Sequence, residues 1–120
     1  MHPSSKQIVL IQSDPFLAET RRRILEARGY IVQVMDSVSQ ARNLAHKFDC
    51  DLVIVDADKS HDTALELCEE IKKNNPGLNV ALMVRYHVYL KSECPDEVIR
   101  QEEGPEGFMR KVDDMLRPTA

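Results

Sequence analysis

Four apolar residues in a row, at positions 52–55, are followed directly by Asp56, and this arrangement limits the fold more than any other part of the sequence. An unbroken apolar run of this kind is typical of a strand buried on both faces, as in a parallel sheet covered by helices. The carboxyl end of such a strand is where open α/β sheets bind ligands. Asp56 is therefore the first candidate functional residue, although a polar turn leading into the next helix would also place an aspartate there.

Short apolar runs alternate with segments of helical periodicity along the chain, which predicts βα units around a parallel sheet. Pro15 and Gly29 mark the start and the end of a first helix, and Ser37 with Gln40 forms a candidate capping box for a second. A third helix is expected from about Thr63. The expected strands are residues 8–11, 30–35, 51–56, 80–84 and 97–100, and the last helix opens near Pro105 and closes before Pro118.

The fourth helix is expected to be short. Thirteen residues separate Val84 from Val98, and a parallel crossover with its helix needs about a dozen or more in total. Residues 87–92 are the most that this helix can occupy. The same region holds Tyr86, Val88, Tyr89 and Leu90, which either cover the sheet in place of the helix or anchor a partner protein.

Length and composition favour one soluble domain. With 120 residues, 42% of them hydrophobic and 30% charged, the chain is expected to be a single domain over residues 1–120 with no output domain. The net charge is −4 and the basic residues are spread along the chain, so no nucleic-acid partner is expected. No apolar run is long enough to span a membrane, and no signal peptide is recognised, which predicts a cytoplasmic protein.

The remaining clusters are interpreted as structural. Arg21, Arg22 and Arg23 are bracketed by Glu19 and Glu26, which favours a solvated helix face. The three cysteines form no CxxC pair and the four histidines show no metal-ligand spacing, so neither a disulfide framework nor a zinc site is expected.

Four stretches together resemble a response regulator receiver domain, and the resemblance extends from about Gln7 to Leu116. They are IVLIQSDPFL, DLVIVDADKSHDTALELCEEIKK, VALMV and QEEGPEGFMRKV. The resemblance implies a flavodoxin-like (βα)5 fold of the α/β class, with a parallel five-stranded sheet in the order 2-1-3-4-5. It also implies that Asp56 stands at the position that accepts a phosphoryl group from a histidine kinase.

Receivers surround that aspartate with groups that neutralise negative charge. Because an aspartate is a weak nucleophile toward an anionic phosphoryl donor, the site needs a magnesium ion and an ammonium group. Family members supply two neighbouring acidic residues after the first strand, a hydroxyl residue that ends the fourth and a lysine that ends the fifth. In this chain the acidic pair falls on Gln12 and Ser13, the hydroxyl position on Val84 or Arg85, and the lysine position on Gln101 or Arg100.

These departures fall on residues of the phosphorylation site, and the apolar runs of the strands are kept. This combination predicts a receiver domain with a degenerate phosphorylation site. The expected function is that of a protein-interaction module that is phosphorylation-independent or weakly phosphorylated. No enzymatic activity is expected, except that the domain could accept a phosphoryl group and hydrolyse it slowly. Magnesium binding is expected to be weak or absent, and Arg85 or Arg100 would then neutralise Asp56. The expected partner is a histidine kinase or another signalling protein, and a homodimer is a further option.

Two other functions stay open. In the first, the domain is an active phosphoacceptor, with Asp14, Asp56 and the backbone carbonyl of Asp58 around magnesium and Arg100 in the role of the lysine. In the second, the chain is a flavodoxin-like nucleotide or flavin binder. The first turn, QSDP, argues against the second function because it has no glycine to bring the backbone close to a phosphate.

Overall fold

The computed structural model describes residues 5–43, 48–57, 61–85 and 94–117. Five parallel strands form one sheet in the order β2-β1-β3-β4-β5, as predicted. The strands are β1 (Gln7–Ile11), β2 (Ile31–Met35), β3 (Leu52–Asp56), β4 (Asn79–Val84) and β5 (Glu97–Arg100). The helices are α1 (Pro15–Ala27), α2 (Val38–Asn43), α3 (His61–Asn74) and α4 (Gly104–Leu116), with a short 3-10 helix, Gln101–Glu103, before α4.

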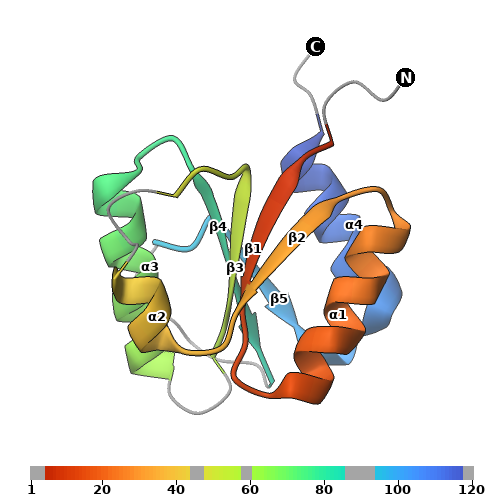
Figure 1. The fold of residues 1–120 in the computed structure, drawn as a ribbon, viewed down its shortest axis with the longest axis horizontal. Helices are drawn as coiled ribbons and strands as arrows, with labels where there is room; N and C mark the ends of the chain where they lie inside the picture. Colours follow the sequence, from red (N-terminus) through yellow and green to blue (C-terminus); the bar gives the residue numbers. More distant parts are fainter. Residues whose placement is uncertain (1–4, 44–47, 58–60, 86–93, 118–120) are drawn as a thin grey trace.

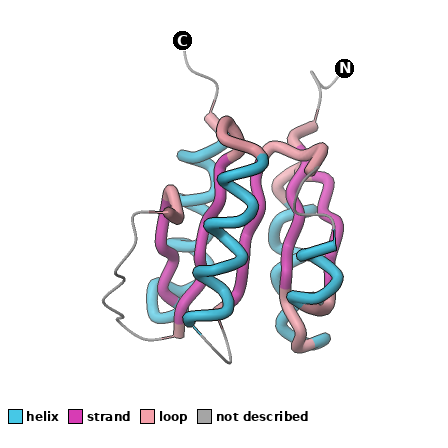
Figure 2. Tube along the Cα trace, turned by 90° about the vertical axis from the view of Figure 1, so that its left-hand side faces the viewer, coloured by secondary structure: helices cyan, strands magenta, loops and turns pink. Residues whose placement is uncertain are grey.

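Two helices cover each face of the sheet. Figure 1 shows α1 and α4 on one side of the strands and α2 and α3 on the other. Figure 2, which looks onto the α2 and α3 side, shows helices lying over the strands. The start of β1 and the end of α4 lie at the same end of the molecule, so the carboxyl ends of the strands are at the opposite end (Figure 1).

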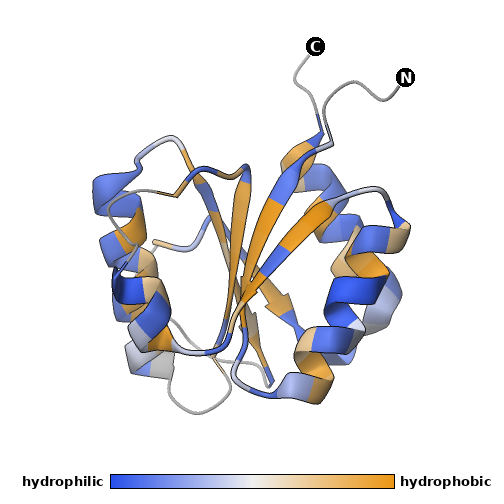
Figure 3. Cartoon of the chain, in the orientation of Figure 1, coloured by the Kyte–Doolittle hydropathy of each residue, from blue (hydrophilic) through white to orange (hydrophobic). Residues whose placement is uncertain are grey.

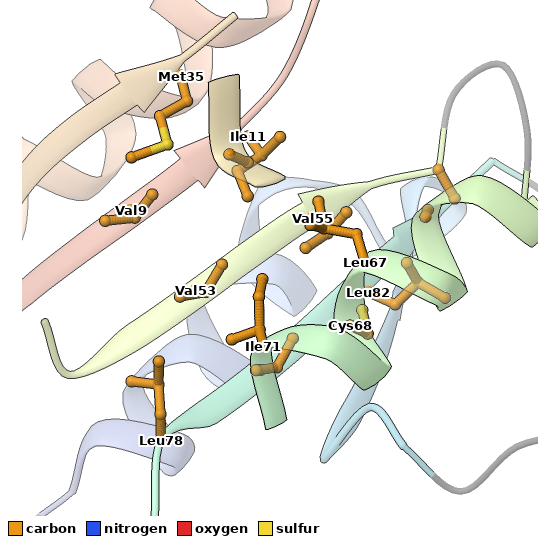
Figure 4. Close-up of a cluster of buried hydrophobic side chains, with 14 of the residues drawn as sticks. Val9, Ile11, Met35, Val53, Val55, Leu67, Cys68, Ile71, Leu78 and Leu82 are labelled. Carbon is orange, nitrogen blue, oxygen red and sulfur yellow. The ribbon is translucent and has the colours of Figure 1, made fainter. Parts of the chain in front are cut away.

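Side chains of the central strands alternate between two apolar cores. In β3, Leu52 and Ile54 contact the core beneath α1 and α4, whereas Val53 and Val55 contact the core beneath α2 and α3. Figure 3 shows the strands as the most hydrophobic part of the chain, and Figure 4 shows the second core, with Cys68 inside it. A strand with apolar residues on both faces needs helices on both, because either face would otherwise be exposed to water.

The predicted strands agree with the structure to within one residue at each end. The first helix ends as predicted at Gly29, whose φ of 97° lies in the left-handed region. At the second helix, Gln40 N–H donates to Ser37 Oγ over 3.0 Å, whereas Gln40 Oε1 accepts the N–H of Asp36 over 3.1 Å; one of the two bonds of the predicted capping box is therefore present. The third helix begins at His61, two residues before the predicted start. The short helix predicted at 87–92, between β4 and β5, is a different segment from α4 and lies outside the described residues.

The inward face of α1 does not include the aromatic residue in its first turn. The helical spacing of Phe16, Leu17, Ile24 and Leu25 predicts one apolar face, yet Phe16 is 76% exposed. The buried residues of the helix are Ala18, Arg21 and Leu25. Because each residue turns the helix by about 100°, Phe16 and Ala18 point in nearly opposite directions.

Candidate functional site

The candidate site lies at the carboxyl edge of the sheet, where β3 ends at Asp56. Side-chain alternation along β3 directs Asp56 to the same side as Leu52 and Ile54, toward α1 and α4. In the sheet, Asp56 pairs with Met83 of β4. The carboxylate is therefore placed beneath the helix that follows β1, and the side chain keeps only 2% of its accessible surface.

Arg21, in the middle of α1, forms an ion pair with Asp56. Its Nη1 donates a hydrogen bond to Asp56 Oδ2, and its side chain is 8% exposed. The guanidinium neutralises the carboxylate where solvent is largely excluded, so the attraction is screened far less than that of a surface pair.

The prediction that residues 21–23 form a solvated face is wrong for Arg21 and correct for its two neighbours. Arg22 binds Glu19 and Glu26, and Arg23 binds Glu19, on the outer side of the helix. A run of three arginines covers about 200° of a helix, so its members cannot all face solvent. Arg21 stands three residues after Ala18 and four before Leu25, so it lies on the same face of the helix as these two apolar residues. This spacing is the signal that could have identified Arg21 as buried.

Gln12 makes a second contact to the Asp56 carboxylate. Its Nε2 donates to Asp56 Oδ2 over 2.5 Å, and its Oε1 accepts the backbone N–H of Asp14 over 2.9 Å. The residue is 2% exposed and its own N–H donates to Met35 O over 2.9 Å. Gln12 therefore points an N–H donor at Asp56 from the position where receivers carry an acidic residue.

The other residues of the first turn have structural contacts. Asp14 is the N-cap of α1, and its Oδ1 accepts the backbone N–H groups of Phe16 (2.8 Å) and Leu17 (3.2 Å). Ser13, the second position of the acidic pair, is exposed. N-cap hydrogen bonds stabilise a helix by about 1 kcal/mol, so turning Asp14 toward a metal would remove that stabilisation.

The described donor set does not fit Mg²⁺. This ion requires oxygen ligands in near-octahedral geometry, whereas an amide N–H and a guanidinium N–H meet at Asp56 Oδ2. Within the described ranges, no three His, Cys, Asp or Glu side chains are grouped to hold a metal ion. Asp58, the proposed carbonyl ligand, lies outside those ranges.

The ends of β4 and β5 hold the remaining predicted positions. Val84 is 1% exposed and belongs to the core beneath α2 and α3, and Arg85 after it is exposed. Arg100 pairs with Val84 in the sheet, and Gln101 begins the 3-10 helix. The cation that binds Asp56 in the described structure is Arg21 of α1, and not Arg85 or Arg100 as the resemblance implied.

Glu103 fixes the turn between β5 and α4. Its Oε2 accepts the backbone N–H of Arg100 over 2.8 Å and the ammonium of Lys111 over 2.9 Å. These two contacts, the backbone one first, lower the pKa of Glu103. Lys111 also donates to Val98 O over 2.8 Å, so this ammonium has acceptors within the turn itself.

Among the described residues, no helix combines the length and the apolarity that are needed to cross a membrane.

Comparisons with known proteins agree with the fold. The transcriptional regulatory proteins GlrR of Escherichia coli K12 and QseF of Escherichia coli O157:H7 are each 26% identical, over 94% of this chain and 27% of theirs. The chain thus spans about a quarter of the length of these curated relatives. A CheY-like receiver domain from Methanospirillum hungatei superposes with a TM-score of 0.82 at 21% identity, covering 94% of each chain.

A second solved structure is the response regulator TrrA of Thermotoga maritima, determined in complex with Mg²⁺-BeF. It superposes with a TM-score of 0.83 at 24% identity, over 92% of this chain and 99% of that one. The model of the family described as response regulator receiver domain matches residues 8–101. Because that match extends from β1 to the end of β5, the chain belongs to the family of response regulator receiver domains, which act in two-component signalling.

Proposed function

We propose that this receiver domain acts as a phosphorylation-independent protein-interaction module whose site is held in one state by an internal ion pair. The observation that carries the proposal is the contact between Arg21 and Asp56, both of which have nearly fully buried side chains. The guanidinium supplies a permanent positive charge, where an ordinary receiver uses a magnesium ion and a lysine. The state of the domain would then be set by folding.

The ion pair opposes phosphorylation of Asp56. A carboxylate attacks phosphorus through an oxygen lone pair, and Oδ2 already accepts hydrogen bonds from Arg21 and Gln12. Phosphorylation would also bring a dianionic group into a site whose lysine position falls on Gln101 or Arg100, neither of which is a lysine. Separating a buried ion pair by removing one partner costs about 3–5 kcal/mol, so we expect the carboxylate to be a much poorer acceptor than an exposed one.

Magnesium binding is proposed to be weak or absent for the same reason. The first-turn positions of the acidic pair carry an amide and a hydroxyl, and the Asp14 carboxylate accepts two N–H groups of α1. A divalent ion at Asp56 would in addition be repelled by the guanidinium of Arg21.

The binding partner is proposed to be a histidine kinase or another signalling protein in the cytoplasm. The family supports this choice, because receiver domains interact with histidine kinases and further signalling proteins. The aromatic segment at 86–90, a candidate partner surface, lies outside the described residues. Homodimerisation is a second form that such a module can take.

Phosphorylation with a small donor tests the proposal directly. Purified wild type, Asp56→Asn and Arg21→Met would be incubated with acetyl phosphate and magnesium, and intact mass would be followed over time. We expect no mass increase for wild type, as for Asp56→Asn. Uptake by wild type that the Asp56→Asn variant loses would overturn the proposal and make the domain an active phosphoacceptor.

The Arg21→Met variant tests the role of the ion pair whether or not wild type takes up phosphate. Its circular dichroism spectrum must match that of wild type, so that unfolding is excluded as a cause. If the ion pair is what prevents phosphorylation, this variant should accept more phosphate than wild type. Arg22→Met is the matched control, since Arg22 binds only surface carboxylates, with its side chain 34% exposed.

A further inference from the structure

A cavity of about 180 Å³ lies next to the buried ion pair, between α1, α4 and the ends of β4 and β5. This is smaller than the usual range of about 300–1,000 Å³ for drug-sized ligands, so only a small molecule would fit. All of its lining residues belong to the described part of the chain. They are Thr20, Arg21, Ile24, Met83, Arg100, Gln101, Gly104, Pro105 and Phe108.

The walls of the cavity are mainly apolar and come from three elements. Ile24 belongs to α1, Met83 to β4 and Phe108 to α4. Met83 and Phe108 are each 4% exposed and are part of the core beneath these helices. The packing of that core therefore fixes the shape of the cavity, and an apolar ligand group would gain by displacing water from it.

The charged lining residues of the cavity are all positive. Arg21 and Arg100 line it, and no acidic residue does. Asp56 neutralises the guanidinium of Arg21, whereas the described residues include no ion-pair partner within 4 Å of Arg100. The side chains that line the cavity therefore present positive charge to a ligand.

Arg21 can bind a ligand without releasing Asp56. A guanidinium carries five N–H donors in a planar fork, and the described contact to Asp56 uses Nη1. Gln101 also lines the cavity, with an amide that can donate a further hydrogen bond. A carboxylate is the planar, singly charged group that such a fork recognises.

We propose that this cavity binds a small monocarboxylic acid with a compact apolar or aromatic body. The carboxylate accepts N–H groups of Arg21 and Gln101, and the apolar body packs against Ile24, Met83 and Phe108. A phosphate ester fits less well, because it brings up to two negative charges against mainly apolar walls. Ligand binding would give the domain a chemical input at the site where other receivers take a phosphoryl group.

This inference does not rest on the proposed function, because the cavity exists whether or not Asp56 accepts a phosphoryl group. Its test contains neither magnesium nor acetyl phosphate, so the two proposals fail separately.

The test is an NMR titration of the full chain with three acids: benzoate, cyclohexanecarboxylate and 3-methylbutanoate. Benzamide is the neutral control and acetate is the control without an apolar body. We expect at least one of the three acids to bind saturably with a dissociation constant on the order of 0.1–1 mM. The shifted signals should include the backbone amides of Met83, Gln101 and Phe108 and the Nε–H of Arg21.

Two variants and a matched control separate this site from general binding to a positive surface. Gln101→Glu adds a negative charge to the lining without changing its size, and Arg100→Met removes a positive charge. Each should weaken acid binding at least tenfold. Arg110→Met removes the charge of an exposed α4 residue that does not line the cavity, and it should leave the dissociation constant unchanged.

Three outcomes would overturn the proposal. They are no saturable shift with any of the three acids at millimolar concentration, equal binding of benzoate and benzamide, and unchanged affinity in both Gln101→Glu and Arg100→Met.

Discussion

Arg21 and Asp56 stand 35 positions apart in the sequence and form an ion pair beneath α1, with Gln12 Nε2 donating to the same carboxylate oxygen. Helix α1 thus supplies from its inward face the positive charge that the ends of β4 and β5 were expected to provide. The pair connects the first βα unit to the central strand, so it has a structural role in addition to the role proposed for Asp56.

Removing Arg21 should destabilise the domain strongly. In Arg21→Met the carboxylate of Asp56 stays buried without the guanidinium, and we expect unfolding free energy to fall by about 3–5 kcal/mol. Urea denaturation measures this loss. The double variant Arg21→Leu with Asp56→Leu removes both charges and should recover most of the stability. Arg22→Met, which breaks surface pairs only, should cost no more than about 1 kcal/mol; an equal loss in both single variants would contradict the assignment.

Changing Gln12 to aspartate should create a response to magnesium. The new carboxylate would lie next to Asp56, where one guanidinium cannot neutralise both, so Gln12→Asp should be less stable than wild type in a chelator. Millimolar magnesium should restore its melting temperature and leave that of wild type unchanged. Gln33→Asp adds the same charge at an exposed position of β2 and serves as the control. A wild-type protein that magnesium stabilises equally would count against the proposed loss of the metal site.

Glu103 should stabilise the domain at neutral pH and not in acid. Because the backbone N–H of Arg100 and the Lys111 ammonium lower the pKa of Glu103, its contribution is present above the unfolded-state pKa. It is lost as the pH falls through the lower folded-state pKa. We expect Glu103→Gln to lower the free energy of unfolding by about 0.5–1 kcal/mol at neutral pH. At a pH at which the Glu103 carboxyl is protonated in wild type, the substitution should leave the free energy of unfolding unchanged. Urea titrations at the two pH values test this, and a cost independent of pH would disprove the electrostatic origin.

Tyr30 should limit stability in alkali. Burial, together with its hydrogen bond to Asp113 (2.5 Å), raises the pKa of Tyr30 to about 12. An unfolded tyrosine ionises near pH 10. The folded state therefore holds its proton longer, and this stabilisation is lost as the pH rises from about 10 to 12. The difference in phenolate absorbance between wild type and Tyr30→Phe reports the titration, and a midpoint near 10 would contradict the prediction.

Gly29 should be difficult to replace. Its φ of 97° allows its N–H to donate to Glu26 O over 2.9 Å and closes α1. A side chain in this region costs about 1–2 kcal/mol, so Gly29→Ala should lower unfolding free energy by that amount. Gly77 is the matched control, because its φ is not positive and no atom lies within 4 Å of an added Cβ. Equal effects of the two substitutions would show that backbone conformation at Gly29 is not limiting.

The sequence alone determined the architecture of this protein. Apolar runs such as residues 52–55 can be buried only between two helical layers, and periodicity and caps then placed the starts of the described helices to within about two residues. The position of Asp56 followed as well, because a residue that directly ends a central strand must lie at the carboxyl edge of the sheet. These are local constraints, and each is encoded by residues that are adjacent or a few positions apart.

Only the tertiary structure decided which cation binds Asp56. Arg21 has the same charge as Arg22, and although its spacing from Ala18 and Leu25 indicates burial, spacing alone could not show which group of the sheet it would contact. That depends on the rotation of α1 against the sheet, in which Ala18, Arg21 and Leu25 are buried and Leu25 belongs to the core formed by residues of β1, β3, β4 and β5. The same packing turned the Gln12 amide toward Asp56, because burial obliges a polar side chain to find a hydrogen-bond partner within reach.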